Sequence, residues 1–336
     1  MPDFATGYVW LNIIIFVVGL TALIKGSDWF VEAAVALAKR LNIPHIIIGL
    51  TLVSIGTSLP ELGTDVYASI QALQGAANAG NIIAGDIIGS NITNISLVLG
   101  LGIVLMGGMP TPRQLLKRDV SFMFCVFVFL PVTVLLSGSN SGHINRIWGF
   151  VLLFILIGYV YFLFKHPEKV EEMEEDDAEE TSLKSLPVIW LAFFAGLILI
   201  FAGAKASVDN VLRVASQLGL NTAMVSATVV AFGTSLPELA VTITGAVKKQ
   251  HSLALGNIVG SCTFNILLII GICSIISPIP INQGMLYFNI PIMIVCGAVL
   301  ALFMRTKWKL ERLEGFILLL IYLAFCICNI LKMKSH

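Results

Sequence analysis

One heptapeptide occurs twice in this chain. GTSLPEL spans Gly56–Leu62 and returns unchanged at Gly233–Leu239. A second pair of similar blocks follows in the same order: GDIIGSNITNISLVLG starts at Gly85 and GNIVGSCTFNILLIIG starts at Gly256. Two blocks that recur in the same order and at nearly the same separation indicate an internal duplication. We therefore predict a fold built from two related halves.

The duplicated blocks lie in a strongly apolar chain. It is 57% hydrophobic and only 12% charged, whereas a soluble domain carries about 25% charged residues. A helix needs about 20 apolar residues to cross a bilayer, and ten such segments fit the sequence. The expected spans are 8–40, 44–72, 80–106, 117–137 and 145–164, then 185–217, 221–247, 251–276, 284–304 and 312–331. The predicted fold class is an all-α integral membrane protein with ten transmembrane helices.

One polar stretch separates the two sets of five spans. It holds nine carboxylates between Glu168 and Glu180, which is typical of a solvated linker. We therefore divide the chain into a first five-helix repeat (1–164), an acidic linker (165–184) and a second five-helix repeat (185–336). Because each half has an odd number of spans, the two halves are expected to insert in opposite orientations.

Basic residues in the loops predict which side each loop faces. The turns after spans one, three, five, seven and nine hold fourteen lysines and arginines, against four on the opposite side. Cytoplasmic loops carry the excess of Lys and Arg. We therefore predict a multi-pass protein of the cell membrane with both termini extracellular and the acidic linker cytoplasmic. The net charge of zero gives no indication of nucleic-acid binding.

A proline lies inside each copy of GTSLPEL. Pro60 has no amide hydrogen, and its ring crowds the carbonyl group four residues back, on Gly56. Pro237 does the same to Gly233. We therefore expect the second and seventh helices to break near the middle of the membrane and to leave carbonyl groups without helical partners. Such backbone persists in a bilayer only where it lines a cavity or binds a ligand.

Each expected break carries a threonine, a serine and a glutamate. The two sets are Thr57, Ser58 and Glu61, then Thr234, Ser235 and Glu238. An acidic side chain at this depth costs about 2.5 kcal/mol or more, so the two glutamates need a cation or protons. Calcium binds oxygen atoms of carboxylates, carbonyls and amides, which these blocks offer. The histidine or cysteine ligands that zinc and copper prefer are missing from this face.

The second block of each half adds polar side chains at helical spacing. Ser90 and Asn94 are four residues apart, as are Ser261 and Asn265, so each pair faces one way. The G-x-x-x-G spacing in the same blocks allows close helix packing. We expect four helices, the second, third, seventh and eighth, to converge on one midplane ion site, as in inverted-repeat transporters. For any single hydroxyl, a hydrogen bond to its own backbone or to a neighbouring helix remains an alternative.

GTSLPE followed by G(N/D)xxGSxxxN, present twice around an acidic central loop, resembles the alpha repeats of the calcium/cation antiporter superfamily. The chain is most similar to the microbial sodium/calcium exchangers, and the resemblance covers both repeats and the ten-span layout. It implies a calcium site formed by Glu61, Glu238 and the carbonyl groups of Thr57 and Thr234. It implies sodium sites that draw on Ser54, Ser58, Ser90, Ala231, Ser235 and Ser261, with Asn94 and Asn265 at the centre.

The chain departs from the family pattern at two positions. Asn265 stands where potassium-dependent members carry aspartate, so potassium coupling is not expected. Asp86 stands where the motif usually has asparagine, and this extra carboxylate either shapes ion access or forms a local hydrogen bond. Asp65, one turn after Glu61, is a candidate for the outer vestibule. Proton-coupled relatives tend to carry a glutamate in GNxxE, which is absent here and favours sodium as the coupling ion.

The predicted function is secondary active antiport of sodium for calcium by alternating access at the paired glutamates. Two carboxylates neutralise one calcium ion or two sodium ions, so the ions would compete for the same oxygens. A proton-coupled calcium/cation antiporter remains an alternative, because buried glutamates can titrate near neutral pH; a cation channel is a further one. The sequence shows no nucleophile with a base, so we expect no enzyme activity. No cofactor is expected, and the partners are calcium, sodium and the lipid bilayer.

Overall fold

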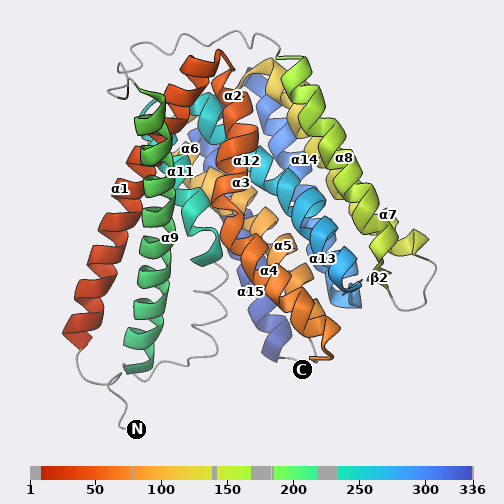
Figure 1. Cartoon of the computed structure of the whole chain (residues 1–336). Coiled ribbons are helices and arrows are strands. Elements are labelled where there is room, and N and C mark those ends of the chain that lie inside the picture. The colour runs from red at the N-terminus through yellow and green to blue at the C-terminus, as the bar shows by residue number, and fades with distance from the viewer. Residues whose placement is uncertain are drawn as a thin grey trace.

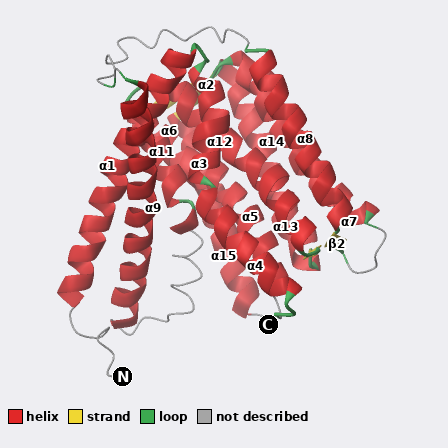
Figure 2. Ribbon diagram, viewed as in Figure 1, coloured by secondary structure: helices red, strands yellow, loops and turns green. Residues whose placement is uncertain are grey.

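The computed structural model describes residues 9–76, 79–137, 142–167, 183, 185–217 and 233–334. These residues are mostly helical, and short loops connect the helices (Figures 1 and 2). The helices of the first half are α1 (Val9–Leu41), α2 (His45–Ile48), α3 (Ser54–Thr57), α4 (Leu59–Leu73), α5 (Ala79–Thr93), α6 (Gly100–Met106), α7 (Ser121–Leu136) and α8 (Arg146–Lys165). Those of the second half are α9 (Leu186–Gln217), α11 (Leu236–Val247), α12 (His251–Phe264), α13 (Gly271–Ile276), α14 (Ile290–Lys307) and α15 (Arg312–Lys334).

Several of the long helices contain a π-helical segment. These segments are η2 (Gly49–Val53), η3 (Asn94–Leu99), η4 (Leu115–Val120), η5 (Asn265–Ile270) and η6 (Met285–Asn289). Two short antiparallel strand pairs join loops from different halves: β1 (Gly108–Pro110) pairs with β4 (Lys309–Glu311), and β2 (His143–Ile144) pairs with β3 (Ile279–Pro280). Each strand pair therefore ties a loop of one half to a loop of the other.

Membrane-length helices agree with the spans expected from the sequence. Among the described residues, eight helices are long and apolar enough to cross a bilayer, and the bent pair His45–Thr57 and Leu59–Leu73 makes a ninth. Their ends fall within a few residues of the expected bounds. The expected span 221–247 lies partly outside the described residues, and its described part includes the short apolar helix α11. The predicted all-α membrane architecture is thus confirmed for the described chain, which shows eight or nine of the ten expected spans.

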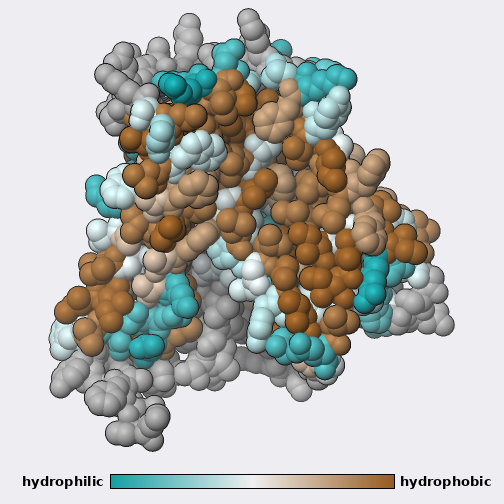
Figure 3. Space-filling view, in the orientation of Figure 1, coloured by the Kyte–Doolittle hydropathy of each residue, from teal (hydrophilic) through white to brown (hydrophobic). Residues whose placement is uncertain are grey.

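Hydrophobic side chains cover the outside of the molecule between its two ends. Phe154, Trp10 and Tyr287 are each more than 70% exposed, which in water would be unfavourable. The space-filling view shows hydrophobic residues across the middle of the visible face and hydrophilic residues toward its ends (Figure 3). This distribution fits a surface that faces lipid.

Two layers of helices differ in how deeply they are buried. Buried residues make up 78% of the most apolar stretch of Ala79–Met106 and 83% of that of His251–Ile276, against 28% for Arg146–Lys165. The third and eighth expected spans therefore form the centre of the protein. The other helices surround them, and a large cluster of buried aliphatic residues fills the space between.

The helices α1 and α9 form a separate pair. They run side by side at the edge of the molecule (Figure 1), and glycines let their backbones approach closely. A Cβ atom on Gly203 would lie 2.6 Å from the carbonyl oxygen of Gly19, and one on Gly26 would lie 2.8 Å from that of Gly196. Because these close backbone contacts recur along the pair, α1 and α9 pack as one rigid unit.

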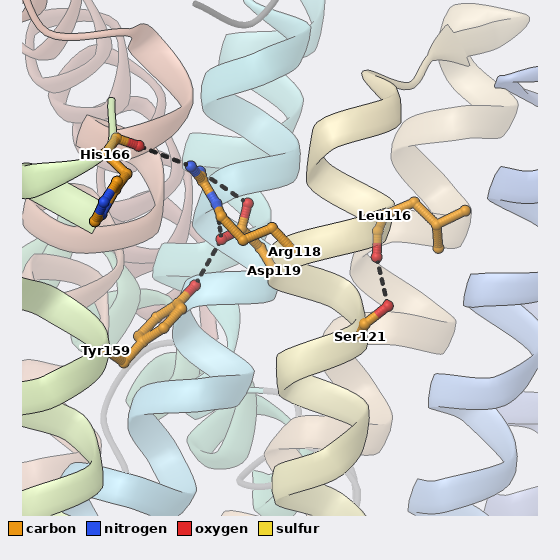
Figure 4. A network of polar contacts seen from close by, with 6 residues as sticks. All are labelled: Leu116, Arg118, Asp119, Ser121, Tyr159 and His166. Atoms are coloured by element: carbon orange, nitrogen blue, oxygen red, sulfur yellow. Dashed lines mark hydrogen bonds and ion pairs between the residues drawn. The ribbon is translucent and has the colours of Figure 1, made fainter. Parts of the chain in front are cut away.

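A buried ion pair inside η4 is hydrogen-bonded to α8. The Arg118 Nε atom lies 2.9 Å from Asp119 Oδ1, and the Asp119 side chain is fully buried. The Tyr159 hydroxyl donates to the same carboxylate oxygen at 3.0 Å, and Arg118 Nη1 donates to the carbonyl oxygen of His166 (Figure 4). The carboxylate is thereby paired and hydrogen-bonded, as a buried charge requires.

Candidate functional site

Both copies of GTSLPEL contain a break in the helix. Ser58 has φ −86° and ψ 7°, and Ser235 has φ −87° and ψ 4°, so both leave the helical conformation at the same motif position. The helices on the two sides of Ser58 are bent by 48°. Each proline lies in the first turn of the following helix, where the missing amide hydrogen costs no hydrogen bond. The predicted break is confirmed, although the carbonyl group of Gly56 still accepts a backbone N–H at the end of α3.

The breaks place the two glutamates in the interior. Glu61 starts α4 and is 2% exposed, and Glu238 starts α11 and is 1% exposed. The two carboxyl groups lie within electrostatic range of each other. Ser58 Oγ donates a hydrogen bond to Glu238 Oε1 at 3.2 Å. The break of the first half therefore contacts the glutamate of the second half directly, although the two residues are 180 positions apart.

The central helices α5 and α12 complete this group. Thr57 Oγ1 donates to Asn257 Oδ1 at 3.1 Å and lies 3.5 Å from the hydroxyl of Ser261. Asn265 Nδ2 donates to Asn91 Oδ1 at 3.0 Å. Side chains from both halves thus meet in one buried polar cluster between the broken helices and the central helices.

Several buried oxygens of the predicted site residues have no hydrogen-bond partner among the described residues. Seven such buried side-chain oxygens belong to residues that the sequence predicted for the site: Glu61 Oε2, Ser90 Oγ, Asn94 Oδ1, Thr234 Oγ1, Ser235 Oγ, Glu238 Oε2 and Asn265 Oδ1. Buried polar atoms in folded proteins are almost always paired with protein or with a bound ligand. Seven unpaired buried oxygens among the described residues of the two duplicated blocks, two of them on glutamates, therefore point to a bound species with positive charge.

The donor set suits a hard cation. Within the described ranges, no group of three or more His, Cys, Asp and Glu side chains is placed to hold a metal ion. A cation here would bind two carboxylates together with hydroxyl and amide oxygens, which is the ligand chemistry of calcium and sodium rather than of zinc or copper.

Ser54 and Asp86 are not among the predicted residues with an unpaired buried oxygen. The hydroxyl of Ser54 donates to the carbonyl oxygen of Leu50 at 2.8 Å and packs against α12. Ala231 lies outside the described residues. Asp86 is half-buried on α5, within electrostatic range of Glu61.

Sequence reasoning missed three buried amide and hydroxyl side chains of the cluster. Asn91, Asn257 and Thr242 are each 0% exposed. Asn91 Nδ2 also donates to the carbonyl oxygen of Cys262 at 3.3 Å. The sequence offered one indication for Asn91 and Asn257, because both lie inside the second pair of similar blocks, which start at Gly85 and Gly256. Sequence reasoning also missed the π-helical turns that begin at Asn94 and Asn265, a distortion that is frequent at functional sites.

The chain matches the family model described as sodium/calcium exchanger protein over residues 11–165 and 188–331. It is 34% identical to the sodium/calcium exchanger MaX1 of Methanosarcina acetivorans, a match that covers 94% of this chain and 98% of MaX1. It is 32% identical to the inner membrane protein YrbG of Escherichia coli, covering 86% of this chain and 87% of that protein.

The fold is similar to solved structures of the sodium–calcium exchanger NCX_Mj. The structure from crystals soaked without sodium and calcium aligns with a TM-score of 0.79 at 29% identity, covering 96% of this chain and 100% of NCX_Mj. A structure soaked with sodium and strontium also aligns with a TM-score of 0.79, at 30% identity. The likeness therefore extends over both halves of the chain.

Proposed function

Because this chain belongs to the sodium/calcium exchanger protein family, we propose that it is a secondary active antiporter that exchanges sodium for calcium across the membrane. The observation that carries the proposal is the set of seven unpaired buried oxygens, two of which belong to buried glutamates from opposite halves. A hard cation supplies the positive charge that these glutamates lack.

The proposed calcium site consists of the two glutamates and two carbonyl groups. Glu61 and Glu238 neutralise the two charges of one calcium ion, and the carbonyl oxygens of Thr57 and Thr234 complete the ligand set at the breaks. The hydroxyl of Ser58, which contacts Glu238 at 3.2 Å, reorients when a cation takes its place on the carboxylate.

The proposed sodium sites use the remaining oxygens of the same cluster. They draw on Ser54, Ser58, Ser90, Ala231, Ser235 and Ser261, with Asn94 and Asn265 at the centre. Since sodium and calcium share Glu61 and Glu238, occupation by one ion excludes the other. This competition couples the inward movement of one ion to the outward movement of the other.

We propose that the full fold has ten spans in two inverted five-helix repeats, with domains 1–164 and 185–336 joined by the acidic linker 165–184. The support is the agreement of the described helix ends with the expected spans. The loop charges support extracellular termini and a cytoplasmic linker.

Alternating access requires one part of the protein to move past another. The pair formed by α1 and α9 suits this role, because it packs as one unit and contacts the broken helix α11 at one edge. Movement of the pair across the four central helices would open the ion site first to one side and then to the other.

The test is calcium uptake into proteoliposomes that hold the purified protein. We expect uptake only when the vesicles are loaded with sodium, and we expect it to saturate with external calcium. Uptake that follows an imposed pH gradient without sodium would identify a proton-coupled antiporter. Uptake that needs no counter-ion would identify a channel. Either result would refute the proposal.

A further inference from the structure

The two halves of the chain differ at two equivalent positions beside the ion site. Asp65 corresponds to Thr242 when the two copies of GTSLPEL are aligned, and Asp86 corresponds to Asn257 when the second pair of blocks is aligned. The first half therefore carries two carboxylates where the second half carries a hydroxyl and an amide.

In the second half these positions form a neutral hydrogen-bonded pair. Asn257 Nδ2 donates to Thr242 Oγ1 at 3.2 Å, and the Asn257 side chain also accepts from Thr57 at 3.1 Å. Both Thr242 and Asn257 are 0% exposed. The amide thus uses both its donor and its acceptor, and this side of the ion site is closed by paired neutral groups.

In the first half no hydrogen bond joins the two equivalent residues, Asp65 and Asp86, in the described structure. Asp65 is 1% exposed and its Oδ2 atom has no hydrogen-bond partner. It lies within electrostatic range of Asp86, on the neighbouring helix α5. An ionised carboxylate only accepts hydrogen bonds, so Asp86 cannot donate to Asp65 as Asn257 donates to Thr242. No ion pair among the described residues joins either aspartate to a lysine or arginine.

We propose that Asp65 and Asp86 form a second cation site, separate from the paired glutamates, which holds one calcium ion between α4 and α5. Two carboxylates balance the charge of one divalent cation, and the unpaired oxygen of Asp65 is buried and available to it. Ligands of oxygen type suit calcium. The role of this second site in transport rests on the proposed antiport function, whereas calcium binding at the site does not.

The position of the pair gives the second site its role. Asp65 follows Glu61 by four residues, about 6 Å along a helix, on the part of α4 that runs toward the end of the molecule where α1 begins and α15 ends (Figure 1). In the proposed orientation this end is extracellular, whereas Thr242 and Asn257 lie on the cytoplasmic side of the glutamates. The second site therefore receives calcium from outside before it reaches the glutamates, whereas the equivalent described positions on the inner side carry the neutral pair Thr242 and Asn257.

The first test is calcium binding to the full-length protein in detergent, measured with radioactive calcium at equilibrium and without sodium. The background variant Glu61→Gln/Glu238→Gln removes the charge of the proposed transport site. We expect this variant to retain one bound calcium ion per chain. Adding Asp65→Thr and Asp86→Asn, which copy the neutral pair of the second half, should abolish it. The matched control Thr242→Val, in the same background, breaks the neutral pair without removing charge and should retain the ion.

Absence of bound calcium in the background variant, or binding that survives the two aspartate substitutions, would overturn the proposal. Each variant is checked for a single elution peak and a cooperative thermal transition. If the combined variants do not fold, calcium transport is measured instead with the single variant Asp65→Asn, in vesicles in which all molecules have the same orientation. There we expect the calcium concentration for half-maximal transport to rise roughly tenfold on the extracellular side, through loss of local cation attraction.

The calcium concentration for half-maximal transport from the cytoplasmic side should change less than twofold. Equal changes on both sides, or none, would contradict a second outer site. Sodium-driven uptake by the wild-type protein decides the proposed antiport independently, so failure of the second site and failure of the antiport proposal give different results.

Discussion

Replacing either buried glutamate by glutamine tests the proposed calcium site. The substitutions Glu61→Gln and Glu238→Gln keep the size of the side chain and leave an acceptor oxygen for Ser58, so the fold should persist. They remove one of the two charges that balance the calcium ion. Both side chains are at most 2% exposed, so losing one of these charges resembles removing one partner of a buried ion pair. Such a loss costs about 3–5 kcal/mol. At about 1.4 kcal/mol per factor of ten, the affinity for calcium should fall roughly 100- to 4,000-fold.

The assay is sodium-driven calcium uptake into proteoliposomes over a wide range of external calcium. Uptake by either variant should be undetectable at the calcium concentration that half-saturates the wild-type protein. Thr133→Ala is the matched control, because its buried hydroxyl is bonded to its own helix α7, outside the proposed ion sites, and its loss should change half-saturation by much less. A half-saturating concentration within threefold of wild type in Glu61→Gln or Glu238→Gln would refute the reasoning.

Three further outcomes are expected. Gly260→Ala would place a Cβ atom 2.5 Å from a main-chain carbonyl oxygen of the first broken helix and should destabilise the protein by about 1–3 kcal/mol. Gly158→Ala, where no described atom lies within 4 Å of the added carbon, is the control, and equal melting temperatures in detergent would contradict the packing argument. Asp119→Ala removes the fully buried partner of the Arg118 guanidinium and should cost about 3–5 kcal/mol, whereas Tyr159→Phe removes one hydrogen bond worth about 1 kcal/mol; thermal unfolding of both variants compares them. Because Asn265 is uncharged, replacing potassium by choline should leave sodium-driven calcium uptake unchanged, and a potassium requirement would count against the assignment of this position.

Much of this architecture follows from local properties of the sequence. Apolar segments of about 20 residues predicted the helix ends, because the bilayer thickness sets the length of a span. Pro60 predicted the break, because proline cannot continue a helix as its interior residue. The duplicated motif predicted that polar residues of the two halves belong together, and in the structure Ser58 contacts Glu238 and Thr57 lies beside Ser261.

Other features depend on contacts that no local pattern records. The π-helical turns that begin at Asn94 and Asn265 shift the register of the following helix, and the spacing of apolar residues in a helix buried on all sides does not reveal such a shift. The hydrogen bond from Ser58 to Glu238 joins segments that are far apart in the sequence. The difference between Asp65 and Thr242 is visible in the sequence, but only the packing of α4 on α5 shows that Asp86 faces the same site.

The contacts of α1 indicate what alternating access has to break. Ser27 Oγ lies 2.7 Å from Thr244 Oγ1 of α11, and Lys248 Nζ lies 3.6 Å from Asp28 Oδ1. The hydroxyl pair is partly buried and contributes about 1 kcal/mol, while the ion pair is one-third exposed and contributes no more than that. The backbone contacts between α1 and α9 are closer and more numerous along the helices. Movement of the pair would therefore break these polar contacts with α11 and leave α1 and α9 together. It would also have to slide the pair along the buried apolar side chains Leu236 and Val241 of α11, which pack in the same cluster as residues of α1 and α9.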